Sequence, residues 1–264
     1  MNASVQPSTP YVLRLIDEGV ATLTLNRGDR FNPLSLPMLE SLQTELDAVA
    51  DDPNVRAIVI AARGRGFCAG HDLKELSAHA DDPDWQQRLF GTCNRLMLAL
   101  TQSPLPVIAR VHGMAFAAGC QLVSMCDLAV SVTTAQFALP GINVGVFCTT
   151  PAVGVVRNVQ RKHAMEMLLT GAPIDAATAL SRGLVNQVVE LDELDAAVNR
   201  YTSVIKLRSR SVIAAGKQAF YRQADLSIAA AYALAGDAMV DNIALDDAHE
   251  GMAAFVDKRP PRWN

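Results

Sequence analysis

The first fifty residues combine two patterns of apolar and polar positions. Residues 11–16 and 20–25 alternate apolar with polar positions on either side of an Asp-Glu-Gly turn, which predicts a β-hairpin. Ser35 then precedes apolar residues spaced three and four apart through residues 38–49, so we expect a helix capped by that serine. The chain therefore begins with elements that each bury one face.

Three later apolar runs, at residues 55–61, 106–111 and 127–132, are short and continuous, which predicts strands buried on both faces. Helical patterns at residues 85–100 and 118–125 lie between them. This succession predicts parallel strands joined by right-handed crossovers, and hence an α/β core. Ligands bind such sheets outside the carboxyl ends of the strands.

After about residue 160 the pattern becomes mainly helical, with one further strand expected at residues 184–189. We therefore expect an α/β core over residues 1–195 and a helical oligomerisation region over residues 196–264. The helices are expected at residues 161–169, 175–182, 191–206, 208–222 and 226–255.

Composition narrows the class of protein. The 264 residues carry a net charge of −4, which lacks the basic excess of a nucleic-acid-binding surface. The five cysteines show neither a CxxC spacing nor a histidine at metal-ligand spacing. We therefore expect reduced thiols and no metal site.

The start of the chain and the length of its apolar runs bear on location. Residues 1–10 are polar, without the apolar stretch of a signal peptide or the Arg-rich pattern of a transit peptide. No apolar run reaches the ~18–20 residues of a membrane span. We expect a cytoplasmic protein without a membrane partner.

Two glycine-containing turns carry the candidate chemistry. Residues 65–72 (RGFCAGHD) and 112–121 (HGMAFAAGCQ) each follow an expected buried strand and lead into a helical pattern. A glycine turn before a helix lets backbone N–H groups point at an anionic ligand. One such turn alone is more often a tight connection. Two of them in succession favour an oxyanion hole made by the N–H groups of His71 and Ala118.

The segments around these turns resemble the crotonase, or enoyl-CoA hydratase/isomerase, superfamily over nearly the whole chain. The resemblance implies a ββα-spiral core with a C-terminal α-helical trimerisation region, and activity on acyl-CoA thioesters. It implies no cofactor apart from the coenzyme A of the substrate, and a homotrimer or a dimer of trimers. The matching segments are residues 20–26, 64–73, 111–127, 135–145, 164–180, 183–188 and 246–259.

The same resemblance assigns expected roles to individual residues. The oxyanion donors fall on His71 and Ala118, and a C-terminal Phe-x-x-Lys reaches coenzyme A bound by a neighbouring subunit. The expected substrate-binding residues are Arg30, Phe31, Ala69, Gly70, Asp72, Leu73, Met114, Gly119, Phe255 and Lys258.

The chain departs from the family pattern at both positions of the hydratase glutamates. Gln121 stands where the first glutamate is expected and Gly141 where the second is expected. Hydration requires a base to activate water and an acid to protonate carbon. A glutamine amide cannot take up a proton, and glycine has no side chain. The sequence therefore argues against efficient hydration, and it most resembles a divergent branch with mitochondrial and bacterial members.

Cys148 is one alternative source of chemistry. Dihydroxynaphthoyl-CoA synthase, of the same superfamily, also has glycine at the position of Gly141 and places a catalytic aspartate where Cys148 stands. That thiol is a candidate nucleophile or weak acid, although a small residue lining the acyl pocket is the more ordinary interpretation. The synthase fills its missing carboxylate with bicarbonate, so we also consider a bound anion or water beside Gly141.

The histidines have ordinary interpretations as well. We expect His112 to form a hydrogen bond at a strand end. The neighbour of His71, Asp72, is expected to cap a helix. A catalytic role for the His71 ring is the less favoured interpretation.

Two functions of different classes follow from these residues. The first is an enzyme that stabilises an acyl-CoA enolate through the His71 and Ala118 N–H groups, with Gln121 orienting water or substrate. Isomerisation, decarboxylation, hydrolysis and slow hydration are the reactions left open for it. The second is a catalytically weak acyl-CoA-binding or regulatory protein of fatty-acid metabolism.

Overall fold

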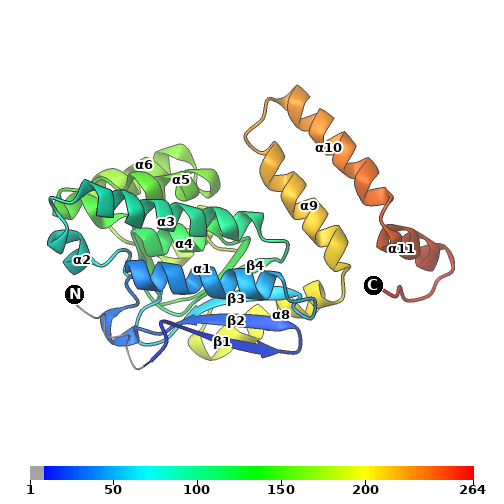
Figure 1. Cartoon of the computed structure of the whole chain (residues 1–264), viewed down its shortest axis with the longest axis horizontal. Coiled ribbons are helices and arrows are strands. Elements are labelled where there is room, and N and C mark those ends of the chain that lie inside the picture. The colour runs from blue at the N-terminus through cyan, green and yellow to red at the C-terminus, as the bar shows by residue number, and fades with distance from the viewer. Residues whose placement is uncertain (1–8) are drawn as a thin grey trace.

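A computed structural model describes residues 9–264. Its main sheet has six strands in the order β1-β2-β3-β4-β6-β9, parallel except for the antiparallel pair β1 and β2 (Figure 1). The hairpin and the three buried strands expected from the sequence are confirmed. The strands are β1 (Val12–Asp17), β2 (Val20–Leu25), β3 (Ala57–Ala62), β4 (Val107–Val111), β6 (Leu128–Val132) and β9 (Gln187–Val189).

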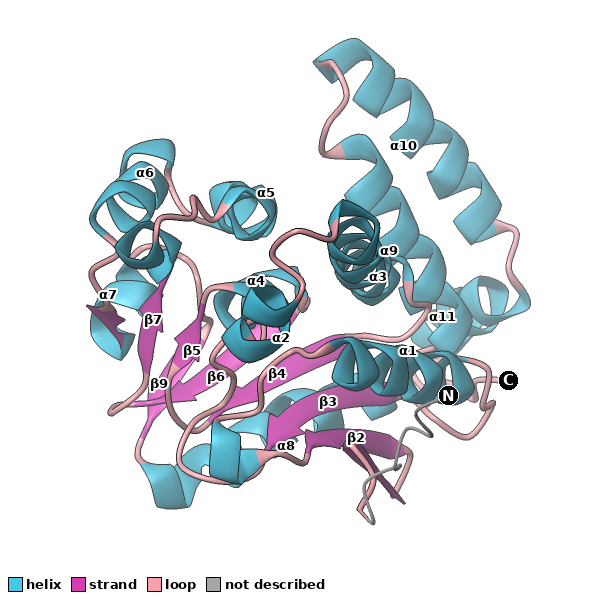
Figure 2. Ribbon diagram, turned by 60° about the vertical axis from the view of Figure 1, so that its left-hand side comes forward, coloured by secondary structure: helices cyan, strands magenta, loops and turns pink. Residues whose placement is uncertain are grey.

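Helices cover both faces of this sheet, which explains why β3 is buried along its whole length. Figure 2 shows α1 (Leu36–Ala50) and α3 (Pro83–Gln102) on one side and α8 (Leu194–Lys206) on the other. Ser35 caps α1 by accepting a hydrogen bond from the Met38 N–H, as expected. Helix α8 contacts β3, β4 and β6. The packed core therefore extends beyond residue 195, where we expected it to end.

A second, small sheet was not expected from the sequence. It joins β5 (Ala115–Phe116), β7 (Gln136–Ala138) and β8 (Ile174–Asp175) in the order β5-β7-β8. Helix α5 (Thr149–Asn158) was also missed, while α4 (Ala118–Met125) matches its expected bounds. The remaining helices of this region are α2 (Leu73–Ala78), α6 (Arg161–Thr170) and α7 (Ala176–Ser181).

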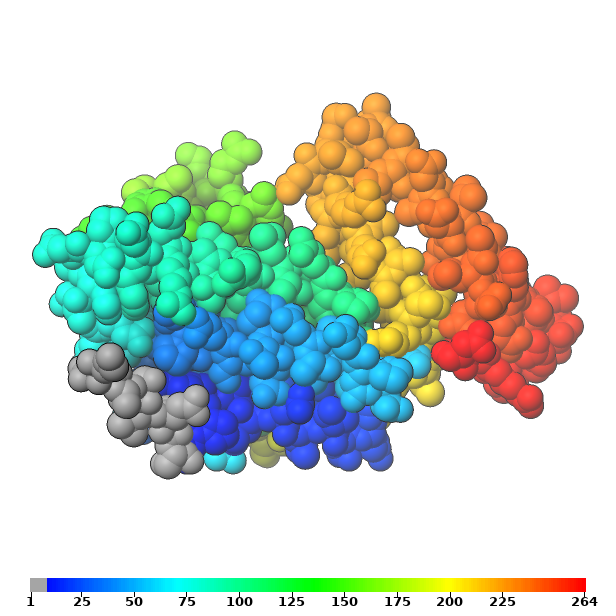
Figure 3. All heavy atoms as spheres, viewed as in Figure 1, coloured from blue at the N-terminus to red at the C-terminus, as the bar shows by residue number. Residues whose placement is uncertain are grey.

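The chain ends in a helical arm, which we define as α9 (Arg210–Gln223), α10 (Ile228–Ile243) and α11 (Asp246–Val256). The expectation of one continuous helix over residues 226–255 is wrong. Loops separate these helices, and α11 is bent by 71° from α10. Figure 3 shows the arm set apart from the green part of the body by a notch.

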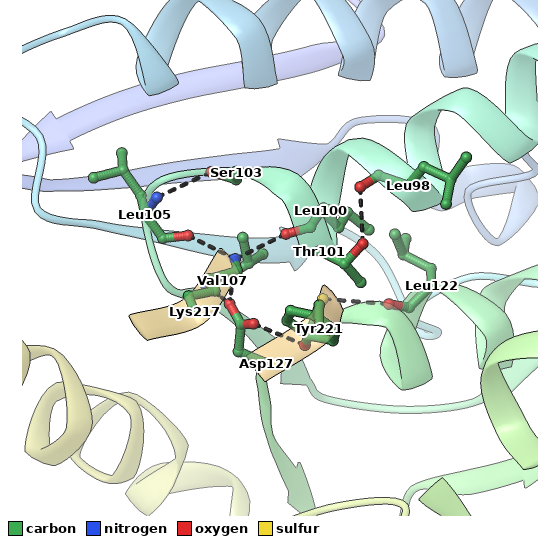
Figure 4. Close-up of polar contacts among 11 residues, drawn as sticks. Leu98, Leu100, Thr101, Ser103, Leu105, Val107, Leu122, Asp127, Lys217 and Tyr221 are labelled. Carbon is green, nitrogen blue, oxygen red and sulfur yellow. Dashed lines mark hydrogen bonds and ion pairs between the residues drawn. The ribbon is translucent and has the colours of Figure 1, made fainter. Parts of the chain in front are cut away.

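A buried ion pair fastens the arm to the body. The Lys217 ammonium on α9 donates to Asp127 Oδ2 at 2.6 Å and to the carbonyl oxygens of Leu100 and Leu105 (Figure 4). The Tyr221 hydroxyl donates to the other Asp127 oxygen at 2.8 Å. Since all three ammonium protons have acceptors, this cluster fixes where α9 leaves the body.

The outer faces of the arm are apolar and exposed. None of the residues of α9 or α10 is buried. Among residues 9–264, no single helix is long and apolar enough to cross a membrane, and α10 with α11 reaches that composition only as a bent pair. The large exposed apolar side chains of the arm are Phe220, Leu226, Ile228, Tyr232, Met239, Val240, Ile243, Met252, Phe255 and Val256.

Candidate active site

The two glycine turns lie against each other at the carboxyl ends of β3 and β4. Cys68 in the first turn forms a parallel bridge with Ala115 in the second, and the Phe116 N–H donates to the Cys68 carbonyl at 2.9 Å. A Cβ on Gly119 would stand 2.2 Å from that carbonyl oxygen. Glycine is therefore required at residue 119 for the two turns to meet.

Two residues with positive φ, a backbone conformation that residues other than glycine rarely adopt, complete this contact. Gly70 has φ +93°, and a Cβ there would stand 2.8 Å from the Ala117 Cβ and 3.1 Å from the Ala118 nitrogen. Ala117 itself has φ 48° and ψ −120°, a strained conformation for a residue other than glycine. It is held by the Ala117 N–H, which donates to the Ala138 carbonyl at 2.9 Å.

The two expected donor groups are left without acceptors by this arrangement. Neither the His71 N–H nor the Ala118 N–H donates to an acceptor within residues 9–264. Ala118 begins the eight-residue helix α4, whose first N–H groups and dipole favour negative charge at that end. The arrangement can therefore stabilise an oxygen that becomes anionic.

Asn32 supports the first turn, and the sequence reasoning missed it. Its side chain is fully buried and donates to the carbonyl oxygens of Arg63, Gly66 and Phe67 at 2.8–3.1 Å. It also accepts from the Arg27 N–H at 2.8 Å. The one signal in the sequence is an asparagine directly before Pro33, where a turn is expected.

The neighbouring Phe31 and Arg30 reach the same turn. The Ala69 N–H donates to the Phe31 carbonyl at 2.9 Å, and the Phe31 ring lies beside Gly66 and Met114. Arg30 forms an ion pair with Asp72 at 2.7 Å. These expected substrate-binding residues therefore gather around the two donors, with the exposed Leu73 at the start of α2.

The carboxylates that follow the first turn are already engaged. Asp72 caps α2 by accepting from the Lys74 N–H at 2.9 Å, as expected, and its other oxygen pairs with Arg30. Glu75 accepts from the Leu36 N–H at 3.1 Å. Both side chains therefore have structural partners.

The His71 ring is turned away from solvent. Its Nδ1 lies 3.0 Å from the Leu34 carbonyl, so Nδ1 carries the proton and donates it. Its Nε2 is buried without a partner in the described chain, and the ring meets Phe90 edge-on. Burial lowers the pKa of His71, with the Leu34 hydrogen bond opposing, which favours a neutral ring.

Gln121 lies on α4 one turn after Ala118, so the two share a face of the helix. Its side chain is 3% exposed, and its Oε1 is buried without a partner within residues 9–264. A neutral amide at this place binds by hydrogen bonds and transfers no proton.

Gly141 does not leave the empty space that the sequence suggested. A Cβ there would stand 2.4 Å from the Val146 carbonyl oxygen and 2.7 Å from Cys148 Sγ. The Val146 N–H donates back to the Gly141 carbonyl at 2.9 Å, which closes the loop that follows the 3₁₀ turn η2 (Pro140–Val144). The loop therefore leaves no room for a side chain at residue 141, and the bound anion or water beside Gly141 stays a prediction.

Cys148 has the properties of an unreactive pocket residue. It is buried at the start of α5, and burial raises the pKa of its thiol, with the Gly141 N–H opposing. A nucleophilic cysteine requires the opposite shift. The ordinary interpretation of Cys148 is the one that its surroundings favour.

Other expected residues fall outside this cluster. His112 Nε2 lies 2.9 Å from the Gly64 carbonyl, which confirms its expected hydrogen bond at the end of β4. Phe255 and Lys258 lie on or just after α11, on the opposite side of the molecule from α2 (Figure 1). Within residues 9–264, no three His, Cys, Asp or Glu side chains are arranged to hold a metal ion.

Comparison with known proteins identifies the family of this chain and the relatives within that family that it resembles. The enoyl-CoA hydratase/isomerase family model matches residues 16–264. The mitochondrial enoyl-CoA hydratase domain-containing protein 3 of Xenopus laevis is 47% identical over 255 residues, which span 97% of this chain and 86% of that protein.

Two solved structures show the same likeness. An enoyl-CoA hydratase of Mycobacterium smegmatis has a TM-score of 0.94 at 50% identity, covering 97% of this chain and 99% of the other. Human enoyl-CoA hydratase domain-containing protein 3 has a TM-score of 0.93 at 44% identity, covering 96% and 100%. The expected α/β crotonase-like fold with a C-terminal helical region is confirmed, as is the resemblance to the divergent branch.

The expected cytoplasmic location is contradicted by these relatives. Proteins at 45–47% identity from Xenopus laevis, mouse and human are named mitochondrial. The expectation came from the composition of residues 1–10, of which the structure describes only residues 9 and 10. Composition of so short a segment was a poor guide to location.

Proposed function

The chain belongs to the enoyl-CoA hydratase/isomerase family, and we propose that it binds an acyl-CoA thioester and stabilises its enolate with the N–H groups of His71 and Ala118. One observation carries the proposal: both N–H groups lack acceptors within residues 9–264, at turns that three close backbone contacts force together. Loss of one such donor typically costs ~10²–10³-fold in rate.

The groups beside the hole limit the reaction. Gln121 and Gly141 replace the carboxylates that hydration requires, and Asp72 and Glu75 have structural partners. Efficient hydration is therefore not the proposed activity. Reactions that form the enolate without removing a proton suit this site, and loss of CO₂ from a 2-carboxyacyl thioester is one of them.

A neighbouring copy completes the proposed site. Phe255 and Lys258 are exposed and lie far from the hole of their own chain, and from the family resemblance we infer that they bind coenzyme A held by another copy. The exposed apolar faces of α9 and α10 support assembly into a homotrimer or a dimer of trimers.

The test uses acetoacetyl-CoA, whose keto and enolate forms differ in near-ultraviolet absorbance. We expect the bound thioester to release its C2 proton to solvent and to show the enolate band at a pH where the free thioester is in the keto form. Ala118→Pro removes one donor at the first position of α4, where no intrahelical hydrogen bond is lost; because proline also disfavours the conformation of Ala117, thermal melting checks that the variant is folded. It should reduce enolate formation by at least ~10²-fold. Binding without any enolate band in the unchanged protein would contradict the proposal.

The second candidate function is acyl-CoA binding without turnover. The observation that favours it is the absence of an unpaired carboxylate among the residues that surround the hole in the described chain. A protein of this kind would bind both saturated and unsaturated acyl-CoA thioesters and release them unchanged.

A further inference from the structure

The chain after α11 folds back along that helix. We call residues 258–264 the C-terminal strap. Within it, the Trp263 indole N–H donates to the Leu207 carbonyl at 2.7 Å, at the end of α8. The Trp263 ring lies 3.1 Å from the place that a Cβ on Gly251 would occupy. One side chain therefore joins α11 to the helix that covers the main sheet.

Polar contacts fasten the strap at both of its ends. The Asn264 N–H donates to Asp247 at 2.9 Å, and this buried carboxylate also accepts from the Ser209 hydroxyl that caps α9. Near the start of the strap, Arg259 binds Glu250 through two hydrogen bonds of 2.7 and 2.9 Å. The strap therefore ties α11 to the beginning of α9 as well as to α8.

Two side chains at the turn into the strap remain turned outward. Phe255 is 85% exposed, and the Lys258 ammonium forms no hydrogen bond or ion pair within residues 9–264, although the Lys258 backbone N–H donates to the Phe255 carbonyl at 3.3 Å. Lys258 has φ 54°, which is unfavourable for lysine unless the turn around it is held. The Arg259 N–H closes that turn by donating to the Ala254 carbonyl at 3.0 Å.

An aromatic ring and an unpaired ammonium at fixed spacing suit a nucleotide, whose base stacks and whose phosphate accepts hydrogen bonds. A free chain end would lose conformational freedom on binding such a ligand. A strap that is already ordered avoids this loss.

We propose that Trp263 and the C-terminal strap are positioning elements for coenzyme A, holding Phe255 and Lys258 against the nucleotide of a thioester bound by a neighbouring copy. This inference rests on the proposed function. In this proposal Trp263 acts through its contacts with Leu207 and Gly251 and does not itself bind the ligand.

The experiment compares two ligands that share the acyl group and differ in the nucleotide. Calorimetry gives the Kd of crotonyl-CoA and of crotonyl-pantetheine for the full-length protein, Trp263→Ala and Trp263→Phe. For Trp263→Ala we expect the Kd of crotonyl-CoA to rise about tenfold, with that of crotonyl-pantetheine unchanged. Trp263→Phe keeps a ring beside Gly251 and loses the indole N–H, so a rise of about threefold is expected.

Light scattering on the same samples establishes that each variant assembles like the unchanged protein. Equal weakening of both ligands would overturn the inference, because a merely structural role predicts it. No weakening of either ligand would also overturn it. Should Trp263→Ala not assemble, the ratio of the two Kd values for Trp263→Phe decides in the same way. If the unchanged protein binds neither ligand, the proposed function itself fails.

Discussion

The two sides of the proposed acyl site differ in the groups that form them, which are backbone N–H groups on one side and side chains on the other. On the donor side, the N–H groups of His71 and Ala118 are placed by backbone contacts, and glycine at residues 70 and 119 permits them. The facing side, by which we mean Gln121, Gly141 and Cys148, has no side chain that gains or loses a proton readily. The first side is specified by the fold and the second by single residues.

Under the proposed function, the difference explains how an oxyanion hole persists where the acid–base groups of the family pattern are replaced. A backbone donor survives most substitutions, because only changes that move the turn affect it. A general acid or base disappears with one substitution, at a typical cost of ~10²–10⁴-fold in rate. The predictions below test each side separately.

The largest effect is expected where the two turns meet. Gly119→Ala places a methyl group 2.2 Å from the Cys68 carbonyl oxygen, so the turns must separate. We expect the free energy of unfolding to fall by about 3 kcal/mol. Thermal melting measures this as a Tm lower by roughly 6–12 °C for a protein of this size.

The matched control for that variant is Gly91→Ala on α3, where an added Cβ meets nothing within 4 Å. It should stabilise the helix by roughly 0.5–1 kcal/mol. Equal behaviour of the two variants would show that the turns are not in close contact.

A smaller effect is expected at Gly141. Gly141→Glu restores the residue type of the hydratase pattern. However, its Cβ overlaps the Val146 carbonyl, so the carboxylate does not reach the expected place. We expect the exposed loop to shift at a cost of about 1–3 kcal/mol, with no gain in crotonyl-CoA hydration. A hydration rate raised more than about tenfold would show that the loop has room for a working acid.

Cys148→Ser is expected to have little effect on enolate formation. Because burial raises the pKa of the thiol, it remains protonated at neutral pH and contributes packing alone. The absorbance of bound acetoacetyl-CoA should change by less than about twofold, since a hydroxyl of similar size replaces the thiol. A loss near 10²-fold would assign Cys148 to the chemistry.

The smallest effect concerns pH. The pKa of His71 is lowered in the folded protein, so the unfolded chain binds a proton first as pH falls through its ordinary value of ~6.5. His71 therefore costs no stability at higher pH and reduces stability below about pH 6.5.

The matched variant for this effect is His71→Asn, whose amide can still donate to the Leu34 carbonyl. Urea unfolding between pH 5 and 8 should show a weaker loss of stability at low pH in the variant. Parallel curves would mean that another group, such as the half-buried His112, carries the pH dependence.

The donor side was largely predictable from sequence and the facing side was not. A glycine turn after a buried strand is a local pattern, so the positions of residues 70 and 119 followed from it. The crowding at Gly141 depends on Val146, five residues later in an exposed loop, and no periodic pattern reports it.

Packing also explains the elements that were missed. Helix α5 contains Thr149, Thr150 and Gly154, which are poor helix formers, and it packs on α4 where Gly154 meets Ser124. β5 has two residues and is too short for any periodicity. In residues 226–255 the helical pattern continues through Leu245, where the structure turns, and the strap contacts α11 in its new direction through Trp263 and Asn264.

The most direct test of the whole account is the rate at which the purified protein hydrates crotonyl-CoA, followed as loss of the conjugated thioester absorbance, with binding measured on the same sample. Ordinary enzymes turn over at ~1–10³ per second. The account predicts that crotonyl-CoA binds and that its hydration is at least ~10²-fold slower than this range. Turnover within the range would contradict it, because groups other than the missing carboxylates would then be transferring the protons.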